Sequence, residues 1–167
     1  MRANKAINGE INTLEFCLFL VILGAVFSIA LVLFNTFLAR TQVSTGIISL
    51  KPIQLEVMEY YLDAGKMPKD ARQLGLEQDK SKPFSRYIQK VTVENGKITA
   101  TFSTGGHELI QGKSITLFPY RDEMQGLVWV CQKSSVDEDY KPFPSTNYEL
   151  INIEYIPDEY LPNNCRK

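Results

Sequence analysis

The chain has 167 residues and a formal net charge of −1 at pH 7. That length has room for one domain and an anchoring segment, and it excludes two full-sized domains. The balanced charge excludes a global basic field of the kind that attracts nucleic acid or an anionic surface. We therefore expect no partner that is held by bulk charge.

A basic, leader-like segment, residues 1–10, precedes a strongly apolar one. Between Glu15 and Arg40 lie 24 residues whose only ionisable group is the thiol of Cys17. As a helix they would span about 36 Å, enough to cross a hydrocarbon core of about 30 Å. Apolar side chains surround the whole helix, and the rest of the chain is too small to bury it inside a soluble domain. We predict a membrane-anchoring helix within residues 11–40.

The remainder, residues 41–167, reads as one globular domain that begins with more helix. Apolar residues recur at near-helical spacing through residues 41–64, although Gly46 and Pro52 weaken the pattern and Pro52 is expected to bend the helix. Gly65 is the expected helix end. A polar connection, residues 65–86, follows. The amphipathic half of the helix needs a sheet to lie against.

A sheet is predicted over residues 87–132. Two alternating β-rich runs flank Asn95-Gly96, the strongest short-range hairpin signal. Four short strands without intervening helices predict an antiparallel meander, and residues 148–156 offer a further strand edge. The runs expected to form strands are 87–94, 97–103, 113–119 and 127–132. The predicted fold class is α+β, a long N-terminal helix packed on about four antiparallel strands.

Two cysteines remain outside the apolar segment, Cys131 and Cys165. An even pair that closes a long C-terminal region, residues 131–165, suits an oxidising compartment. A disulfide between them would fasten a chain end that otherwise frays. Two unpaired buried thiols are the alternative.

The sequence contains no pattern typical of an enzyme. The single histidine, His107, follows two glycines and reads as a turn residue, and no metal-ligand spacing, nucleophile elbow or phosphate loop is present. Three consecutive acids, residues 137–139, are interpreted as solvated. We expect no catalysis and no cofactor.

Several separated motifs resemble those of one family. NTLEFCLFLVILGAVFSIAL resembles the assembly helix of a type IV pilin, with Glu15 as its single glutamate and Gly24 as its glycine. FLARTQVSTGIISLKPIQLEVMEYYLDAGKMP resembles the stretch that leads into the connecting loop. YIQKVTVENGKITATF and LIQGKSITLFPY resemble the first three strands, and GLVWVC with YLPNNCR resembles the disulfide-joined segments. The resemblance is to the type IVa, short-leader class.

This resemblance implies a structural subunit that polymerises into a pilus supporting adhesion, twitching motility or DNA uptake. Its partners would be other pilin subunits, the assembly machinery, a prepilin peptidase and, before assembly, membrane lipid. The subunit would wait in the bacterial inner membrane and end in an extracellular pilus. In the family, the glutamate that Glu15 matches pairs with the N-terminal amine of a neighbouring subunit, so Glu15 would set the register between subunits. A snorkelling acid without function is the alternative.

Two features depart from the family. Counting back from Glu15 makes Ile11 the first mature residue and puts Glu10, where the family has glycine, before it. Cleavage after Gly9 would leave Glu10 first and Glu15 sixth, and we expect that site if the leader is removed. The family's helix-breaking proline is also missing, because Ala30 to Phe34 reads ALVLF. Such a helix should resist melting midway, with Gly24 as its weak point.

A minor pilin that binds DNA or a surface ligand is the alternative function. DNA capture needs a basic stripe with aromatic side chains. The only cluster of this kind comprises Lys80, Lys82, Arg86 and Lys90 with two aromatic neighbours, and nearby acids dilute it. The loop 134–147 is a more natural adhesion surface. A type II secretion pseudopilin is a third hypothesis. The disulfide-closed tail argues against it, because that tail resembles those of pilus subunits.

Overall fold

The computed structural model describes residues 13–76, 82–124, 126–131, 139–144, 146–149 and 154–166. The chain forms two compact units, residues 1–35 and residues 36–167, which are treated separately below. The first unit contains the beginning of helix α1. The second, here called the headgroup, contains the rest of α1 and the described strands.

Two consecutive helices open the described chain, α1 (Thr13–Ser49) and α2 (Lys51–Ala64). They are separated at Leu50, whose N–H donates to the Ile47 carbonyl three residues back. Pro52 lies in the first turn of α2, where a missing N–H is tolerated. Where a bend at Pro52 was expected, the structure shows an interruption at Leu50, two residues before the proline.

Gly65 ends α2 as predicted. Its backbone is left-handed (φ 67°), and its N–H donates to the Tyr61 carbonyl at 2.9 Å. This is the usual glycine stop of a helix. A short 3₁₀ turn, η1 (Ala71–Leu74), follows in the connection. The side chain of Asp70 caps it by accepting hydrogen bonds from the backbone N–H groups of Arg72 and Gln73.

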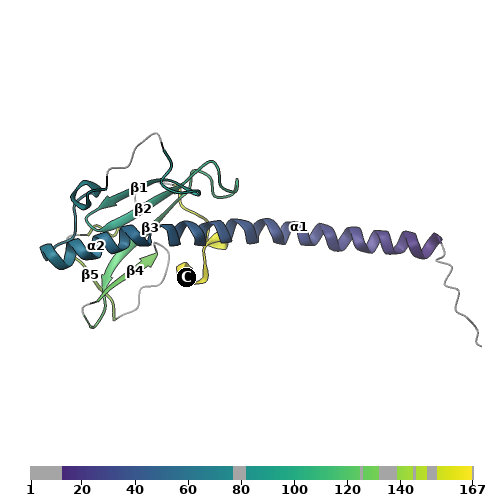
Figure 1. Ribbon diagram of the computed structural model, residues 1–167. Helices are drawn as coiled ribbons and strands as arrows, with labels where there is room; N and C mark the ends of the chain where they lie inside the picture. The colour runs from purple at the N-terminus through teal and green to yellow at the C-terminus, as the bar shows by residue number, and fades with distance from the viewer. Residues whose placement is uncertain are drawn as a thin grey trace, which may run out of the picture. The chain divides into compact units, whose positions relative to one another are not determined.

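The predicted antiparallel meander is confirmed, in the order β1-β2-β3-β4 (Figure 1). The strands are β1 (Ile88–Glu94), β2 (Lys97–Phe102), β3 (Ser114–Arg121) and β4 (Leu127–Cys131). The structure extends the third strand two residues beyond its predicted end. Proline at position 119 sits within it, opposite Trp129 of β4.

The hairpin between β1 and β2 turns at Asn95-Gly96, as the sequence predicts. Both residues have positive φ, 49° and 82°, which a two-residue type I′ turn requires. Glu94 and Lys97 face each other across the turn. A side chain at Gly96 would also collide with Met67, because an added Cβ would lie 2.7 Å from its sulfur.

A fifth strand was not predicted. β5 (Lys141–Pro142) is two residues long and pairs with the end of β3. Its shortness and its proline hide it from any pattern of alternation. The further edge expected over residues 148–156 lies partly outside the described residues. Within them, Tyr155 forms a parallel bridge with Ser114, the Glu154 carbonyl accepts the Ser114 N–H, and the Ile156 N–H donates to the Ser114 carbonyl.

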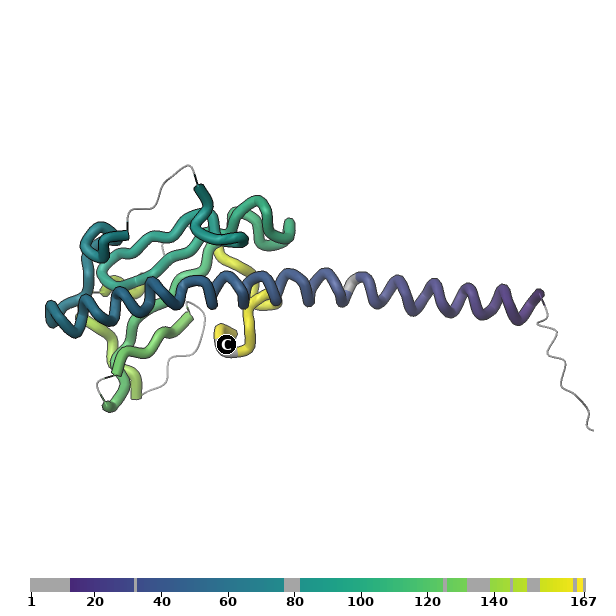
Figure 2. Tube along the Cα trace, viewed as in Figure 1, coloured from purple at the N-terminus to yellow at the C-terminus, as the bar shows by residue number. Residues whose placement is uncertain are grey.

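In the headgroup, the helices lie across one face of the sheet (Figures 1 and 2). The buried residues of the helices are Ala39, Val43, Leu50, Ile53 and Val57. With Gly46 they form a stripe spaced alternately four and three residues apart, which keeps one helix side toward the sheet. The sheet meets this stripe with buried apolar residues of β1 and β2, among them Ile88, Ile98 and Phe102.

Gly46 is where helix and sheet approach most closely. An added Cβ would lie 2.8 Å from two ring atoms of Phe102 and 3.1 Å from Ile88 Cδ1. Phe102 is itself only 1% exposed, so its ring has no room to withdraw. The glycine that weakens the helical pattern therefore permits the packing of the helix on the sheet.

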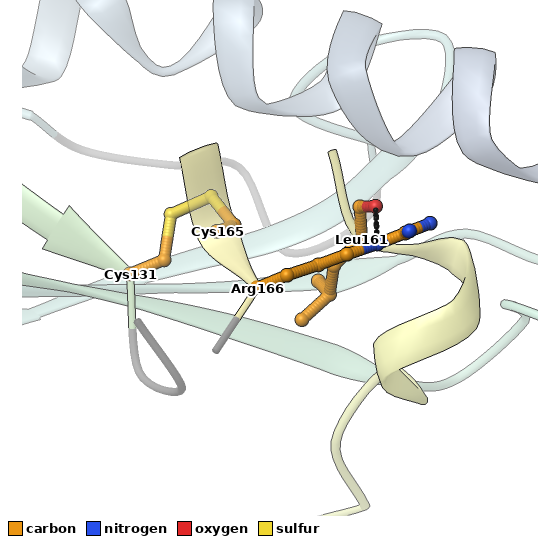
Figure 3. Close-up of a disulfide and its surroundings, with 4 residues drawn as sticks. All are labelled: Cys131, Leu161, Cys165 and Arg166. Carbon is orange, nitrogen blue, oxygen red and sulfur yellow. Dashed lines mark hydrogen bonds between the residues drawn. A yellow bond between two sulfur atoms is a disulfide. The ribbon is translucent and has the colours of Figure 1, made fainter. Parts of the chain in front are cut away.

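The C-terminal segment returns to the sheet through two short 3₁₀ turns, η2 (Asp158–Tyr160) and η3 (Asn163–Cys165). A disulfide joins Cys131, the last residue of β4, to Cys165, with Cα atoms 5.1 Å apart (Figure 3). Arg166 follows at once, and its Nε donates to the Leu161 carbonyl at 2.8 Å. Leu161 and Cys165 are fully buried. The tail is thus part of the core.

Replacing Gly46 by valine is expected to destabilise the headgroup. The branched side chain collides with Phe102, and overpacking of this kind costs about 1–3 kcal/mol, more than the helix gains by losing a glycine. Thermal unfolding of the detergent-solubilised protein measures the effect. Gly24→Val is the matched control, because an added Cβ there meets nothing within 4 Å. Equal melting of the Gly46→Val variant and the wild type would contradict the close approach.

Removal of the disulfide by Cys131→Ser with Cys165→Ser is expected to lower the free energy of unfolding by about 3–4 kcal/mol. The bond closes a loop with a sequence separation of 34, whose closure restricts the unfolded chain. Denaturant unfolding under oxidising conditions checks this value. Cys17→Ser serves as control, since Cys17 is a free, exposed thiol. A double variant as stable as that control would show that the bond contributes nothing.

Candidate assembly helix and disulfide-closed region

The first unit presents apolar side chains on every side of α1. Within residues 13–35 the leucines, isoleucines, phenylalanines and valines with described side chains are about half exposed or more. This is the one helix of the described chain that is long and apolar enough to cross a membrane, and none of its most apolar stretch is buried. A surface of this kind needs lipid or other protein to cover it.

Glu15 lies in the first turn of α1. Its carboxylate is favoured there by the unsatisfied N–H groups of the helix start. Within the described part of the chain no cationic group forms an ion pair with it. A carboxylate beside so much apolar surface requires a cation once water is withdrawn.

Gly9 and Glu10, the residues of the predicted leader cleavage, lie outside the described residues. Cys17, one turn into the apolar surface, is unpaired and exposed. Gly24 has open space around it, and Ser28 donates a hydrogen bond to its carbonyl at 2.8 Å. The sequence expectations for the leader stay predictions.

The disulfide-closed region brings two arginines from opposite ends of the headgroup sequence together. Arg40 Nη2 and Arg166 Nη2 both donate to the Glu159 carbonyl, at 2.8 and 2.9 Å. Arg40 Nε is buried, and the described residues provide no acceptor for it. The neighbouring Glu159 side chain and burial raise the pKa of Tyr160. The sequence analysis missed this pair because its partner is a carbonyl, which leaves no sequence pattern.

Three aromatic residues, Phe118 and Tyr120 of β3 and Tyr148, pack together. The Tyr148 hydroxyl accepts from the Phe143 N–H at 2.8 Å and donates to the Pro119 carbonyl at 2.6 Å. Its ring stacks on Phe118 and tilts against Tyr120, with centroids 5.4 and 4.8 Å apart. Burial raises the pKa of both Tyr148 and Tyr120. These tyrosines are therefore structural and neutral at physiological pH.

The four residues of the candidate nucleic-acid cluster are only partly described. Lys80 lies outside the described residues, whereas Lys82, Arg86 and Lys90 are exposed. The Arg86 guanidinium lies 5.5 Å from the centroid of the Tyr87 ring. Lys90 lines an open groove between η1 and β1 together with Lys69 and Arg72, but also with Asp70 and Glu94. The charge of this groove is mixed, and DNA contact by the cluster stays a prediction.

His107 lies in a turn. Its backbone N–H donates to Gln42 Oε1 at 2.6 Å, and its ring Nδ1 accepts the backbone N–H of Leu109 at 3.3 Å. Of the acidic residues 137–139, only Asp139 is described. Among the described residues, no group of three His, Cys, Asp or Glu side chains is placed to hold a metal ion.

Comparison with known proteins identifies the family. A sequence model of pilin, described as a bacterial filament protein, matches residues 39–166. The chain is 31% identical over 160 residues to a type IV major pilin protein PilE1 of Neisseria gonorrhoeae, covering 92% of this chain and 84% of the relative. It is 27% identical to a fimbrial protein of Neisseria meningitidis (92% and 91% covered) and 29% identical to fimbrial protein EcpC of Eikenella corrodens (86% and 94%). The α+β fold, the disulfide-closed tail and these matches together show that the chain belongs to the pilin family.

Proposed function

We propose that the chain is a structural subunit of a type IV pilus that polymerises through the apolar part of α1. The observation that carries the proposal is the exposed apolar surface on all sides of residues 13–35. Burial of such surface contributes about 25 cal/mol per Å², so packing of several copies is strongly favoured over exposure to water. Adhesion, twitching motility or DNA uptake would follow from the filament.

Before assembly, the same surface would reside in the inner membrane. Its length fits a bilayer, and the disulfide of the headgroup requires an oxidising compartment on the outer side. The subunit would then leave the membrane by exchanging lipid contacts for contacts with other subunits. Both environments are apolar, so the exchange does not expose the helix to water.

Glu15 would set the register between neighbouring subunits during that exchange. Burying the Glu15 carboxylate among apolar neighbours requires a cation close by. The N-terminal amine of an adjacent subunit supplies one in this proposal. Apolar packing alone tolerates sliding of one helix along another, whereas a charge pair favours a single offset.

Replacement of Glu15 by glutamine is expected to reduce surface filaments at least tenfold. The amide keeps the shape but removes the charge, leaving the partner amine buried without a counter-ion, at a cost of about 3–5 kcal/mol. Electron microscopy of a deletion strain that expresses each variant gives the count. Glu56→Gln, an equal change at an exposed site of α2, is the control. Filaments as numerous as with wild type would contradict the role of Glu15.

Maturation of the chain is expected to remove residues 1–9. Gly9 is the nearest glycine before the apolar segment, and small residues suit the site of a leader peptidase. Intact-mass analysis of protein taken from pili should give a chain that begins at Glu10. Gly9→Leu should block cleavage, whereas Asn8→Gln should not. A mature protein that retains Met1 would contradict cleavage.

A further inference from the structure

The two arginines that share the Glu159 carbonyl lie at a particular place along the chain. Arg40 is the first residue with a permanent charge after the apolar segment. In a membrane-anchored subunit Arg40 therefore lies at the polar surface of the lipid bilayer. Arg166 comes from the far end of the sequence, and the Cys131–Cys165 disulfide holds the residue directly before it (Figure 3).

Both guanidinium groups lie side by side because their Nη2 atoms donate to one oxygen. Two like charges repel, and a neutral carbonyl does not compensate them. In the described ranges no ion pair joins either arginine to a carboxylate. Both side chains are half-buried, and Arg40 Nε lacks an acceptor among the described residues. An unsatisfied buried donor of this kind destabilises the fold.

We propose that Arg40 and Arg166 together bind the phosphodiester of an anionic phospholipid in the outer leaflet while the subunit waits in the membrane. A phosphodiester has two charged oxygens, and the planar fork of arginine matches such a group with paired hydrogen bonds. Each guanidinium keeps N–H groups beyond those that bind Glu159 and Leu161. A single lipid phosphate would neutralise the repulsion between the two charges.

The site follows from the fold. The helix brings Arg40 out of the apolar region, and the disulfide brings the last residues of the chain back to it. An isolated Arg40 would offer one flexible cation, whereas the pair offers two cations that are already ordered. Pre-ordered donors lose less conformational entropy when they bind. The inference rests on the membrane-anchored state that the proposed function includes.

The test uses full-length protein reconstituted into phosphatidylcholine vesicles that contain a minor fraction of phosphatidylglycerol. Flotation first reports membrane insertion, which does not depend on the arginine pair. Native mass spectrometry after mild detergent extraction then measures the phosphatidylglycerol retained per protein. Wild type should retain it in preference to phosphatidylcholine, and Arg166→Gln should lower retention about fivefold, as expected for the loss of one basic contact. Arg40→Gln should act similarly.

Arg72→Gln is the matched control, because it removes the same charge from an exposed site on η1. Replacing both Arg40 and Arg166 by lysine keeps the charge and should restore retention only in part, since lysine lacks the planar fork. Circular dichroism checks that each variant is folded, and Arg166→Gln alone suffices if Arg40→Gln unfolds the protein.

The outcomes separate the two proposals. Failure of the wild type to float overturns membrane anchoring and the lipid site with it. Flotation without phosphatidylglycerol preference, or an equal loss in Arg72→Gln, overturns the lipid site alone. Displacement of the lipid by millimolar inorganic phosphate would show a site for free phosphate and would also overturn it.

Discussion

The structure depends on a helix that changes its surroundings partway along its length. In its first part, α1 is apolar all round and is covered by nothing in the described chain. From Ala39 onward one side of the helix is buried, and the sheet covers that side. The first pattern requires an apolar medium and the second requires one packed face. The helix α1 therefore has one part that needs apolar surroundings and another part that packs in the globular core.

The packing of the second part of the helix explains several residues that would each be unfavourable in an isolated helix. Gly46 lowers helix propensity by about 1 kcal/mol, yet only glycine lets the helix lie against the ring of Phe102. Pro52 interrupts a helix, yet it stands in the first turn of α2, where a missing donor does no harm. The break at Leu50 restarts the helix while Leu50, Ile53 and Val57 all stay buried. Local propensity has yielded to tertiary packing at each position.

Most of the fold could be predicted because its signals are local. The alternation of apolar and polar residues predicted the strands. Asn95-Gly96 predicted the hairpin, and Gly65 predicted the helix end. β5 could not be predicted, because two residues carry no periodicity and its pairing depends on where β3 ends. The contact of Gly46 with Phe102 and the meeting of Arg40 with Arg166 also escaped, since each joins residues far apart in sequence. Such contacts arise from the tertiary arrangement and leave no spacing to read.

The charges at the two limits of the apolar segment share one property. Glu15 stands near its start and Arg40 follows its end, and neither forms an ion pair within the described ranges. Unpaired charge beside apolar surface is costly once water is withdrawn from it. In the proposed function, leaving both charges unpaired would let each bind a group on another molecule. Lipid phosphate and the amine of a neighbouring chain are available in different states. Under the proposed function, charge pairing would hold the subunit in the membrane first and align it in the filament later.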